Sequence, residues 1–420
     1  MSAAQWAAVI VTIGLNALDG FDVLSISFAG PGIAADWQLS QSVLGWILAM
    51  ELLGMAVGSI TLGMVGDKLG RRTTMLVCLV LMTIGMFGAG HSAGVNELLA
   101  WRLLTGLGIG GMLAVTTAAA AEFSNGRWRS LALALMVIGY PIGGLTGGFI
   151  VSNLLVDGVW QDIFIFGAWA SAAFIPIVWL LIPESPVFLD RRGGPGALEK
   201  INRSLARFGH PAAESLTPAV AGAAKSSLAD IFKPGLIRST VLVTAAYFSL
   251  ITSFYFLVKW TPKIIVDMGF EPSAAAGVLA WLNVGGATGG AVFGFLATRI
   301  NLRPLTIAVL FGAAAIIVWY GRGHDNLTAL TVALACAGFF TNAAICGMYS
   351  LFAKVFPTHV RATGTGFAIG VGRGGAVLAP IIAGYLFQAG FSLQFVAVVM
   401  AGASLLGAFF LFFLKERAAA

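Results

Sequence analysis

Long runs of apolar residues, separated by short polar stretches, occupy almost the whole chain. Each run is long enough, as an α-helix, to cross a hydrocarbon core about 30 Å thick. The runs lie at residues 6–33, 42–64, 73–91, 96–121, 130–153, 163–183, 237–259, 273–297, 304–321, 327–352, 362–387 and 392–414. The pattern predicts an all-α membrane protein with twelve transmembrane helices.

The composition agrees with a chain that lies mostly in lipid. Of the 420 residues, 58% are hydrophobic and 10% are charged, whereas water-exposed surfaces require about 25% charged residues. The three cysteines, Cys78, Cys336 and Cys346, all fall inside apolar runs, which suggests neither disulfides nor a metal site. Because the sequence shows neither a nucleophile beside a base nor a metal-binding cluster, we expect no enzymatic activity and no metal. We also expect no cofactor.

Basic residues gather in alternate loops. Those that follow the even-numbered apolar runs are Lys68, Arg71, Arg72, Arg127, Arg129, Arg191, Arg192, Lys200, Arg203, Arg207, Lys225, Lys233, Arg238, Arg299, Arg303, Lys354, Arg361, Lys415 and Arg417. Since short cytoplasmic loops carry the excess of Lys and Arg, both termini are predicted in the cytoplasm. The basic loops then face the lipid of the inner leaflet. They account for the net charge of +6, which therefore requires no nucleic-acid partner.

One long polar segment divides the chain into two parts with six apolar runs each. We expect an N-terminal six-helix bundle over 1–183, a cytoplasmic linker over 184–236 and a C-terminal six-helix bundle over 237–420. Within the linker, apolar residues recur at helical spacing and predict an amphipathic helix on the membrane surface. These residues are Leu198, Ile201, Leu205 and Phe208.

The two halves share an internal repeat. A shift of 231 residues carries Gly63–Arg72 onto Gly294–Arg303 without a gap. Repeats of this kind are typical of transporters whose halves rock against each other. The charges inside the apolar runs are not repeated, so we expect acidic groups of the first half and basic groups of the second on opposite walls of a water-filled cavity. Under the shift, Asp19, Asp22, Glu51 and Arg102 fall on Leu250, Ser253, Leu282 and Ala333, and Lys259 and Arg373 fall on Phe28 and Ile142.

Two carboxylates lie inside the first apolar run. Asp19 and Asp22 are three residues apart, so they share one helix face. Charged groups at bilayer depth cost a few kcal/mol each and normally mark an ion or substrate path. We interpret Asp22 as the proton site, with Asp19 or Glu51 as relay or reserve; the alternative is a structural pair with a cation. Arg102 needs a carboxylate or carbonyl partner, and these three carboxylates are the candidates.

Gly63–Arg72 closely resembles the signature of the second loop in the major facilitator superfamily, which has twelve helices in two bundles. Its glycines allow a tight turn between helices and close packing. Arg102 matches the fourth-span motif, and Glu122 with the arginines after it resembles the acidic-then-basic fourth loop. The resemblance implies a charge latch on the cytoplasmic side. Its expected gating residues are Gly63, Asp67, Arg71, Arg72, Glu122 and Arg127.

A more specific resemblance comes from five stretches in order along the chain. Together they look like the aromatic acid:proton symporter family, whose members import benzoate-type carboxylates and related diacids with a proton. The stretches are Asp19-Gly-Phe-Asp22, Gly30-Pro31, Trp260-Thr-Pro262 at the end of the seventh span, Phe356–Gly364, and Gly372-Arg373-Gly-Gly.

An aromatic carboxylate needs a cation and flat apolar walls. Arg373 offers a guanidinium suited to a bidentate carboxylate, and Lys259 offers a point charge. Arg373 could instead pair within the protein, Lys259 could reach the outer interface, and most single aromatic side chains could face lipid or core. The other expected substrate-binding residues are Arg102, Trp260, Tyr255, Asn283 and Asn342, and Tyr140 and Tyr349 are further polar groups in spans.

These observations predict a proton-coupled symporter that imports an organic anion, an aromatic carboxylate first of all, across the inner membrane by alternating access. The proton is the coupling ion, and we expect a functional monomer. Two alternatives remain within carriers: an antiporter that exports a drug or metabolite, and uptake of a muconate-type dicarboxylate. A channel-like or receptor-like protein is a further alternative, against which the internal repeat argues.

Overall fold

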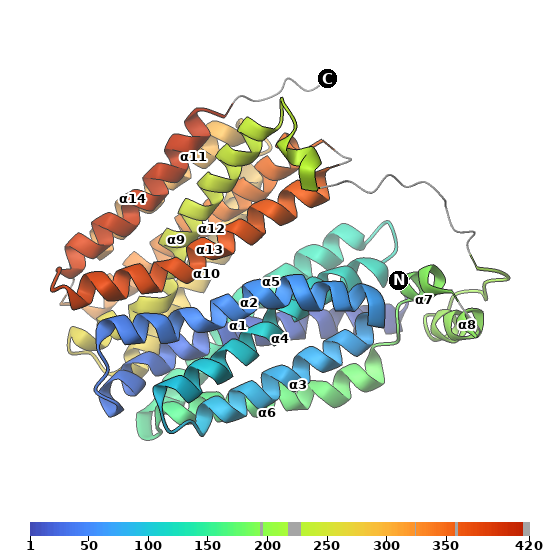
Figure 1. Cartoon of the computed structure of the whole chain (residues 1–420), viewed down its shortest axis with the longest axis horizontal. Coiled ribbons are helices and arrows are strands. Elements are labelled where there is room, and N and C mark those ends of the chain that lie inside the picture. The colour runs from blue at the N-terminus through green and yellow to red at the C-terminus, as the bar shows by residue number, and fades with distance from the viewer. Residues whose placement is uncertain (194–195, 217–227, 324, 358–359, 415–420) are drawn as a thin grey trace. The chain divides into compact units, whose positions relative to one another are not determined.

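The computed structural model describes residues 1–193, 196–216, 228–323, 325–357 and 360–414. In this part of the chain there are fourteen α-helices, one short 3-10 helix and no β-strand (Figure 1). Twelve of the helices are long and apolar enough to cross a membrane. The predicted all-α class and the number of spans are therefore confirmed.

The twelve long helices follow the apolar runs closely. They are α1 (Ala3–Asp36), α2 (Gln41–Leu69), α3 (Arg71–Gly90), α4 (Val95–Glu122), α5 (Arg129–Asp157), α6 (Trp160–Leu181), α9 (Ile237–Asp267), α10 (Pro272–Leu296), α11 (Leu302–Tyr320), α12 (Leu327–Val355), α13 (Arg361–Gln388) and α14 (Leu393–Phe412). Between α6 and α9 lie the shorter α7 (Pro186–Arg192), α8 (Ala197–Arg207) and η1 (Leu228–Phe232). Helix α8 is the predicted amphipathic helix, with Ile201 on its buried side and Phe208, just after it, against Phe123.

The internal repeat extends over all six helix pairs. The shift of 231 residues carries Gln41, the first residue of α2, onto Pro272, the first residue of α10. It also carries Asp36, the last residue of α1, onto Asp267, the last of α9. Every helix from α1 to α6 starts within three residues of its shifted counterpart. A side chain of one half therefore has a defined equivalent in the other.

Contacts between residues divide the chain into two compact units. The first unit comprises Met1–Ser25, Met50–Gly147 and Gln161–Ala223, and the second comprises Ile26–Ala49, Gly148–Trp160 and Ala224–Ala420. One end of each of the helices α1, α2 and α5 thus belongs to the second unit. The division predicted from the sequence, at 1–183, 184–236 and 237–420, stays a prediction.

Helix α9 continues where the sequence predicted its end. The motif Trp260-Thr-Pro262 was expected to close the seventh span, but α9 runs through Pro262 to Asp267. That expectation is wrong because a proline inside a transmembrane helix removes one backbone hydrogen bond without ending the helix when neighbouring groups compensate. Helices α1 and α13 also continue through prolines, at Pro31 and Pro380.

The turn between α2 and α3 is shorter than expected. The apolar runs predict helices over 42–64 and 73–91, but α2 extends to Leu69 and α3 begins at Arg71. Gly70 alone makes the turn, with φ of 100° and ψ of 165°. This backbone conformation is essentially restricted to glycine, so the residue that the turn requires is Gly70.

Candidate functional site

A fully buried ion pair lies inside the first unit. Nη2 of Arg102, on α4, is 2.5 Å from Oε2 of Glu51, on α2, and both side chains are 0% exposed. The same guanidinium donates to the backbone carbonyl of Asp22 at 3.2 Å and lies 5.2 Å from the ring of Phe164. Of the three carboxylates that the sequence left open as partners of Arg102, the ion pair uses Glu51.

Asp22 lies beside this pair without sharing its salt bridge. Its side chain is 0% exposed, and among the described residues no donor forms a hydrogen bond to either carboxylate oxygen. It interacts electrostatically with both Arg102 and Glu51. Asp22 and Glu51 are thus two carboxylates near a single cation, Arg102, and Arg102 forms its ion pair with Glu51. A buried carboxylate without a partner of its own is costly in its charged form.

Asp19 lies one turn before Asp22 and is 2% exposed. It interacts electrostatically with Cys78 of α3. Between the two carboxylates, the backbone of α1 at Gly20 lies directly against the carbonyl of Tyr140 on α5. The sequence led us to expect both carboxylates beside water, whereas protein encloses them in this conformation.

The second unit provides an internal control for these positions. The equivalents of Asp19, Asp22, Glu51 and Arg102 are all buried and uncharged: Leu250, Ser253, Leu282 and Ala333, with exposed fractions of 0%, 0%, 1% and 0%. Side chains at these helix positions can therefore pack without charge. Because the architecture does not need a charged cluster there, the cluster in the first unit indicates function.

Arg373 is a half-buried cation of the second unit. It lies on α13, and within the described part of the chain its guanidinium makes no ion pair or hydrogen bond. It interacts electrostatically with Tyr247 of α9 and Tyr349 of α12. The hydroxyl oxygens of these tyrosines are 3.2 Å apart. Sequence reasoning missed Tyr247, although it lies on the same face of the helix as Tyr255, two turns earlier.

The other predicted binding residues of the second unit differ in their surroundings. Lys259 is 0% exposed, so it does not reach a surface. Asn283 is 8% exposed, and its amide nitrogen has no hydrogen-bond acceptor among the described residues. Asn342 donates to the carbonyl of Gly338 at 3.1 Å. Tyr255 is half-buried, with its ring 5.3 Å from that of Phe254.

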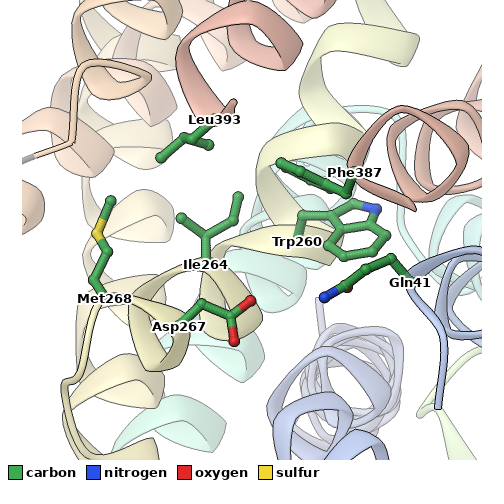
Figure 2. Close-up of a pocket in the computed structure, with 7 residues that line it drawn as sticks. All are labelled: Gln41, Trp260, Ile264, Asp267, Met268, Phe387 and Leu393. Carbon is green, nitrogen blue, oxygen red and sulfur yellow. The ribbon is translucent and has the colours of Figure 1, made fainter. Parts of the chain in front are cut away.

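Trp260 lines a cavity of about 270 Å³ within the second unit (Figure 2). Its indole Nε1 donates to the carbonyl of Pro380 at 3.1 Å, and its ring is 5.0 Å from that of Phe387. The carboxylate of Asp267 also lines the cavity and is bonded to Lys263, one turn earlier on α9. The cavity is thus walled by aromatic and aliphatic groups. Its lining residues are Gln41, Trp260, Ile264, Asp267, Met268, Phe387 and Leu393.

The predicted latch residues meet at the start of α3. Nη2 of Arg71 is 3.0 Å from Oε1 of Glu122. The backbone nitrogen of Arg71 donates to Oε1 of Glu184 at 2.6 Å, and Arg72 donates to the carbonyl of Trp179 at 2.5 Å. Sequence reasoning missed Glu184. Its position just after the sixth span was the available signal.

Two further predicted gating residues, Arg127 and Gly63, lie outside this contact. Arg127 is exposed, with its guanidinium 5.4 Å from the ring of Trp128. Gly63 packs loosely, since a Cβ placed there would be 3.6 Å from Ala114. The side chain of Asp67 lies outside the described part of the structure. Their roles in gating stay predictions.

Twelve membrane-crossing helices in two register-matched halves define a multi-pass protein of the inner membrane, of the kind that carries solutes. The chain belongs to the Major Facilitator Superfamily, which it matches over residues 12–324 and 284–420. The resemblance to that superfamily predicted from Gly63–Arg72 and Arg102 is thereby confirmed.

Two curated relatives are similar to this chain in sequence, and one solved structure is similar to it in fold. It is 29% identical to the gallate transporter of Pseudomonas putida over 94% of this chain and 88% of the relative. It is 29% identical to a 4-hydroxybenzoate transporter of Acinetobacter baylyi over 90% of this chain and 84% of the relative. The predicted resemblance to aromatic acid carriers is confirmed by these relatives. A crystal structure of a D-xylose-proton symporter matches the fold with a TM-score of 0.75 at 18% identity, covering 98% of both chains.

Proposed function

We propose that the chain is a proton-coupled symporter that imports an aromatic carboxylate by alternating access. Both relatives described above are named for ring-hydroxylated benzoates, which supports this substrate class. The chain acts as a monomer, with both termini in the cytoplasm and a six-helix bundle in each half. In this proposal the proton alone is the coupling ion, and the carrier uses no cofactor and catalyses no reaction.

The observation that carries the proposal is the buried group of two carboxylates around one cation. While Asp22 holds a proton, the ion pair of Arg102 and Glu51 leaves the cluster neutral apart from Asp19. When Asp22 releases its proton, its charge competes with Glu51 for Arg102. Proton binding thus changes which contact Arg102 makes, and Asp19 serves as relay. The sequence predicted Arg102 as a substrate-binding residue. In this scheme Arg102 belongs to the proton site instead, because its guanidinium pairs with Glu51.

The anion binds to the second unit in this proposal. The unpaired guanidinium of Arg373 takes the substrate carboxylate, and Lys259 adds a second positive charge. Aromatic and amide side chains then contact the ring and its substituents. These are Tyr255, Trp260, Asn283 and Asn342.

The contacts of Arg71 act as the cytoplasmic latch. Glu122 and Glu184 both bind Arg71. Opening the latch therefore requires Arg71 to leave these carboxylates and take other partners. Arg72 fixes the same helix end on Trp179. Gly63, Asp67 and Arg127 complete the gate in this proposal.

An uptake panel of radiolabelled carboxylates in cells, with and without an uncoupler, tests the function. We expect benzoate-type acids to enter and the uncoupler to stop them. Asp22→Asn should abolish proton-driven uptake yet spare exchange, and Arg373→Ala should lose substrate binding. The matched controls are Asp325→Asn and Arg322→Ala, whose side chains are exposed. Undiminished uptake by Asp22→Asn and Arg373→Ala would remove the mechanism, and substrate expulsion against an inward proton gradient would indicate an antiporter.

A further inference from the structure

Two tyrosines of the second unit form a hydrogen-bonded pair beside Arg373. Tyr247 comes from α9 and Tyr349 from α12, and these two helices and α13 pack against one another (Figure 1). The two hydroxyl oxygens are 3.2 Å apart. The ring of Tyr247 lies directly on the backbone of Gly372, the residue before Arg373. The pair is thus fixed at the part of α13 that carries the unpaired cation.

The two tyrosines differ in accessibility. Tyr247 is 4% exposed, whereas Tyr349 is 45% exposed. Phe352, one turn after Tyr349 on α12, contacts both rings, with centroid distances of 5.4 Å and 6.2 Å. The inner tyrosine is therefore held on several sides, whereas much of the outer one is accessible.

Hydrogen-bond counting shows that this pair leaves one phenol proton for a third group. Each phenol has one proton to donate, and the pair uses only one of the two for its own hydrogen bond. If buried Tyr247 donates to Tyr349, the proton of Tyr349 remains for a third group. A carboxylate on Arg373 can accept it, because a carboxylate offers about four lone-pair sites and a bidentate arginine takes two. Such chained hydrogen bonds strengthen one another.

We propose that Tyr349 binds the substrate by donating a hydrogen bond to the carboxylate that Arg373 holds, and that Tyr247 positions Tyr349 for this contact. The inference rests on the proposed function, in which an aromatic carboxylate binds Arg373, and adds a recognition residue that acts on the acid group whatever the ring carries. Tyr349 thereby selects carboxylates over neutral aromatic compounds.

Equilibrium binding of benzoate and of 4-hydroxybenzoate to the purified full-length protein tests this inference. Tyr349→Phe keeps the ring and removes one hydrogen bond to a charged group, so Kd should rise about tenfold for both ligands. Tyr247→Phe should raise Kd less. The double variant should match Tyr349→Phe alone, because Tyr247 acts only through Tyr349. Tyr385→Phe is the matched control, since Tyr385 lies on α13, as Arg373 does, but is 55% exposed and accepts a hydrogen bond from Trp46.

The outcomes separate the two proposals. Wild-type protein that binds neither acid would overturn both the proposed function and this inference. Wild-type binding that Tyr349→Phe leaves unchanged would overturn this inference alone. A loss confined to 4-hydroxybenzoate would mean that Tyr349 contacts the ring hydroxyl, and it would overturn the assignment to the carboxylate. Thermal unfolding of each variant shows whether a weaker Kd reflects misfolding.

Discussion

The ion pair of Arg102 and Glu51 illustrates what a buried charge does to a membrane protein. Removing both charges from water costs several kcal/mol per ion, about as much as their attraction returns. Such a pair therefore adds little net stability, yet either partner alone is strongly destabilising. The proposed function explains the pair by the neighbouring Asp22, which in that proposal draws Arg102 away when it ionises.

A double-mutant cycle follows from this balance. Arg102→Ala leaves Glu51 charged and buried, so we expect a loss of about 3–5 kcal/mol in stability. Glu51→Leu should cost a similar amount. The double variant should recover most of the loss, because Leu282 and Ala333 occupy the equivalent positions of the second unit at 1% and 0% exposure. Thermal unfolding in detergent measures all three; a double variant less stable than both single variants would contradict the explanation.

The members of this cluster could be predicted from the sequence, but their pairing could not. A charge within an apolar helix must find a partner, which singled out Asp19, Asp22, Glu51 and Arg102. Which carboxylate meets Arg102 depends on how three helices rotate and pack, and no local pattern records that. Tyr247 was missed because a tyrosine in a span is usually part of the core, and no local pattern shows that this one meets Tyr349.

The junction of α2 and α3 depends on a glycine and a carboxylate from far along the chain. Gly70 provides the only turn residue between these two helices, and Glu184 accepts from the first backbone nitrogen of α3. A carboxylate at a helix N-terminus is favoured by the helix dipole and by the unpaired N–H groups there. Glu184 thus ties the end of the sixth span to the start of the third.

Replacing Gly70 should be far more costly than replacing Gly63. Gly70→Ala forces an L-residue into a region essentially restricted to glycine, at a cost of about 1–3 kcal/mol, and its methyl group would lie on the carboxylate of Glu184. Gly63→Ala places a methyl group 3.6 Å from Ala114, which is an ordinary contact. Thermal unfolding and uptake compare the two; equal behaviour would mean that Gly70 does not form the turn.

Glu184 offers a second test of this junction. Glu184→Ala removes the acceptor for the backbone nitrogen of Arg71, so stability should fall by about 1 kcal/mol, as for other lost helix caps. Glu184→Gln keeps an acceptor without the charge and should lie between wild type and Glu184→Ala. Glu199→Gln is the control, because Glu199 is 77% exposed on α8. If Glu184→Ala unfolds at the wild-type temperature, the capping role is wrong.

Helix positions were predictable because apolar length and the 231-residue repeat are properties of long segments. Local signals did less well. Pro262 predicted the end of α9 and the second apolar run predicted the end of α2 at residue 64, yet packing in the membrane overrides both. The amphipathic helix α8 was predictable since its apolar stripe is periodic over several turns.

Across the whole molecule, the two halves share one architecture and divide the chemistry. The repeat matches the twelve long helices, whereas Asp19, Asp22 and Glu51 lie in the first half and Lys259 and Arg373 in the second. In the proposed function, a duplicated scaffold thus carries a proton site in one copy and an anion site in the other. Coupling requires that both sites be filled or both empty when the protein changes conformation, which sets how much charge moves in a cycle.

The proposed cluster binds one proton per cycle, on Asp22, and Arg102 and Glu51 are paired while that proton is bound. With a monoanionic substrate, the loaded carrier then moves no net charge. Proteoliposomes with a potassium diffusion potential but no pH gradient should not accumulate benzoate, whereas a pH gradient alone should drive uptake that Asp22→Asn lacks. A second proton, on Asp19, would make each cycle move one positive charge, worth about 2.3 kcal/mol per 100 mV. Accumulation by voltage alone, about fifty-fold per 100 mV at equilibrium, would therefore refute a single proton site and point to both carboxylates.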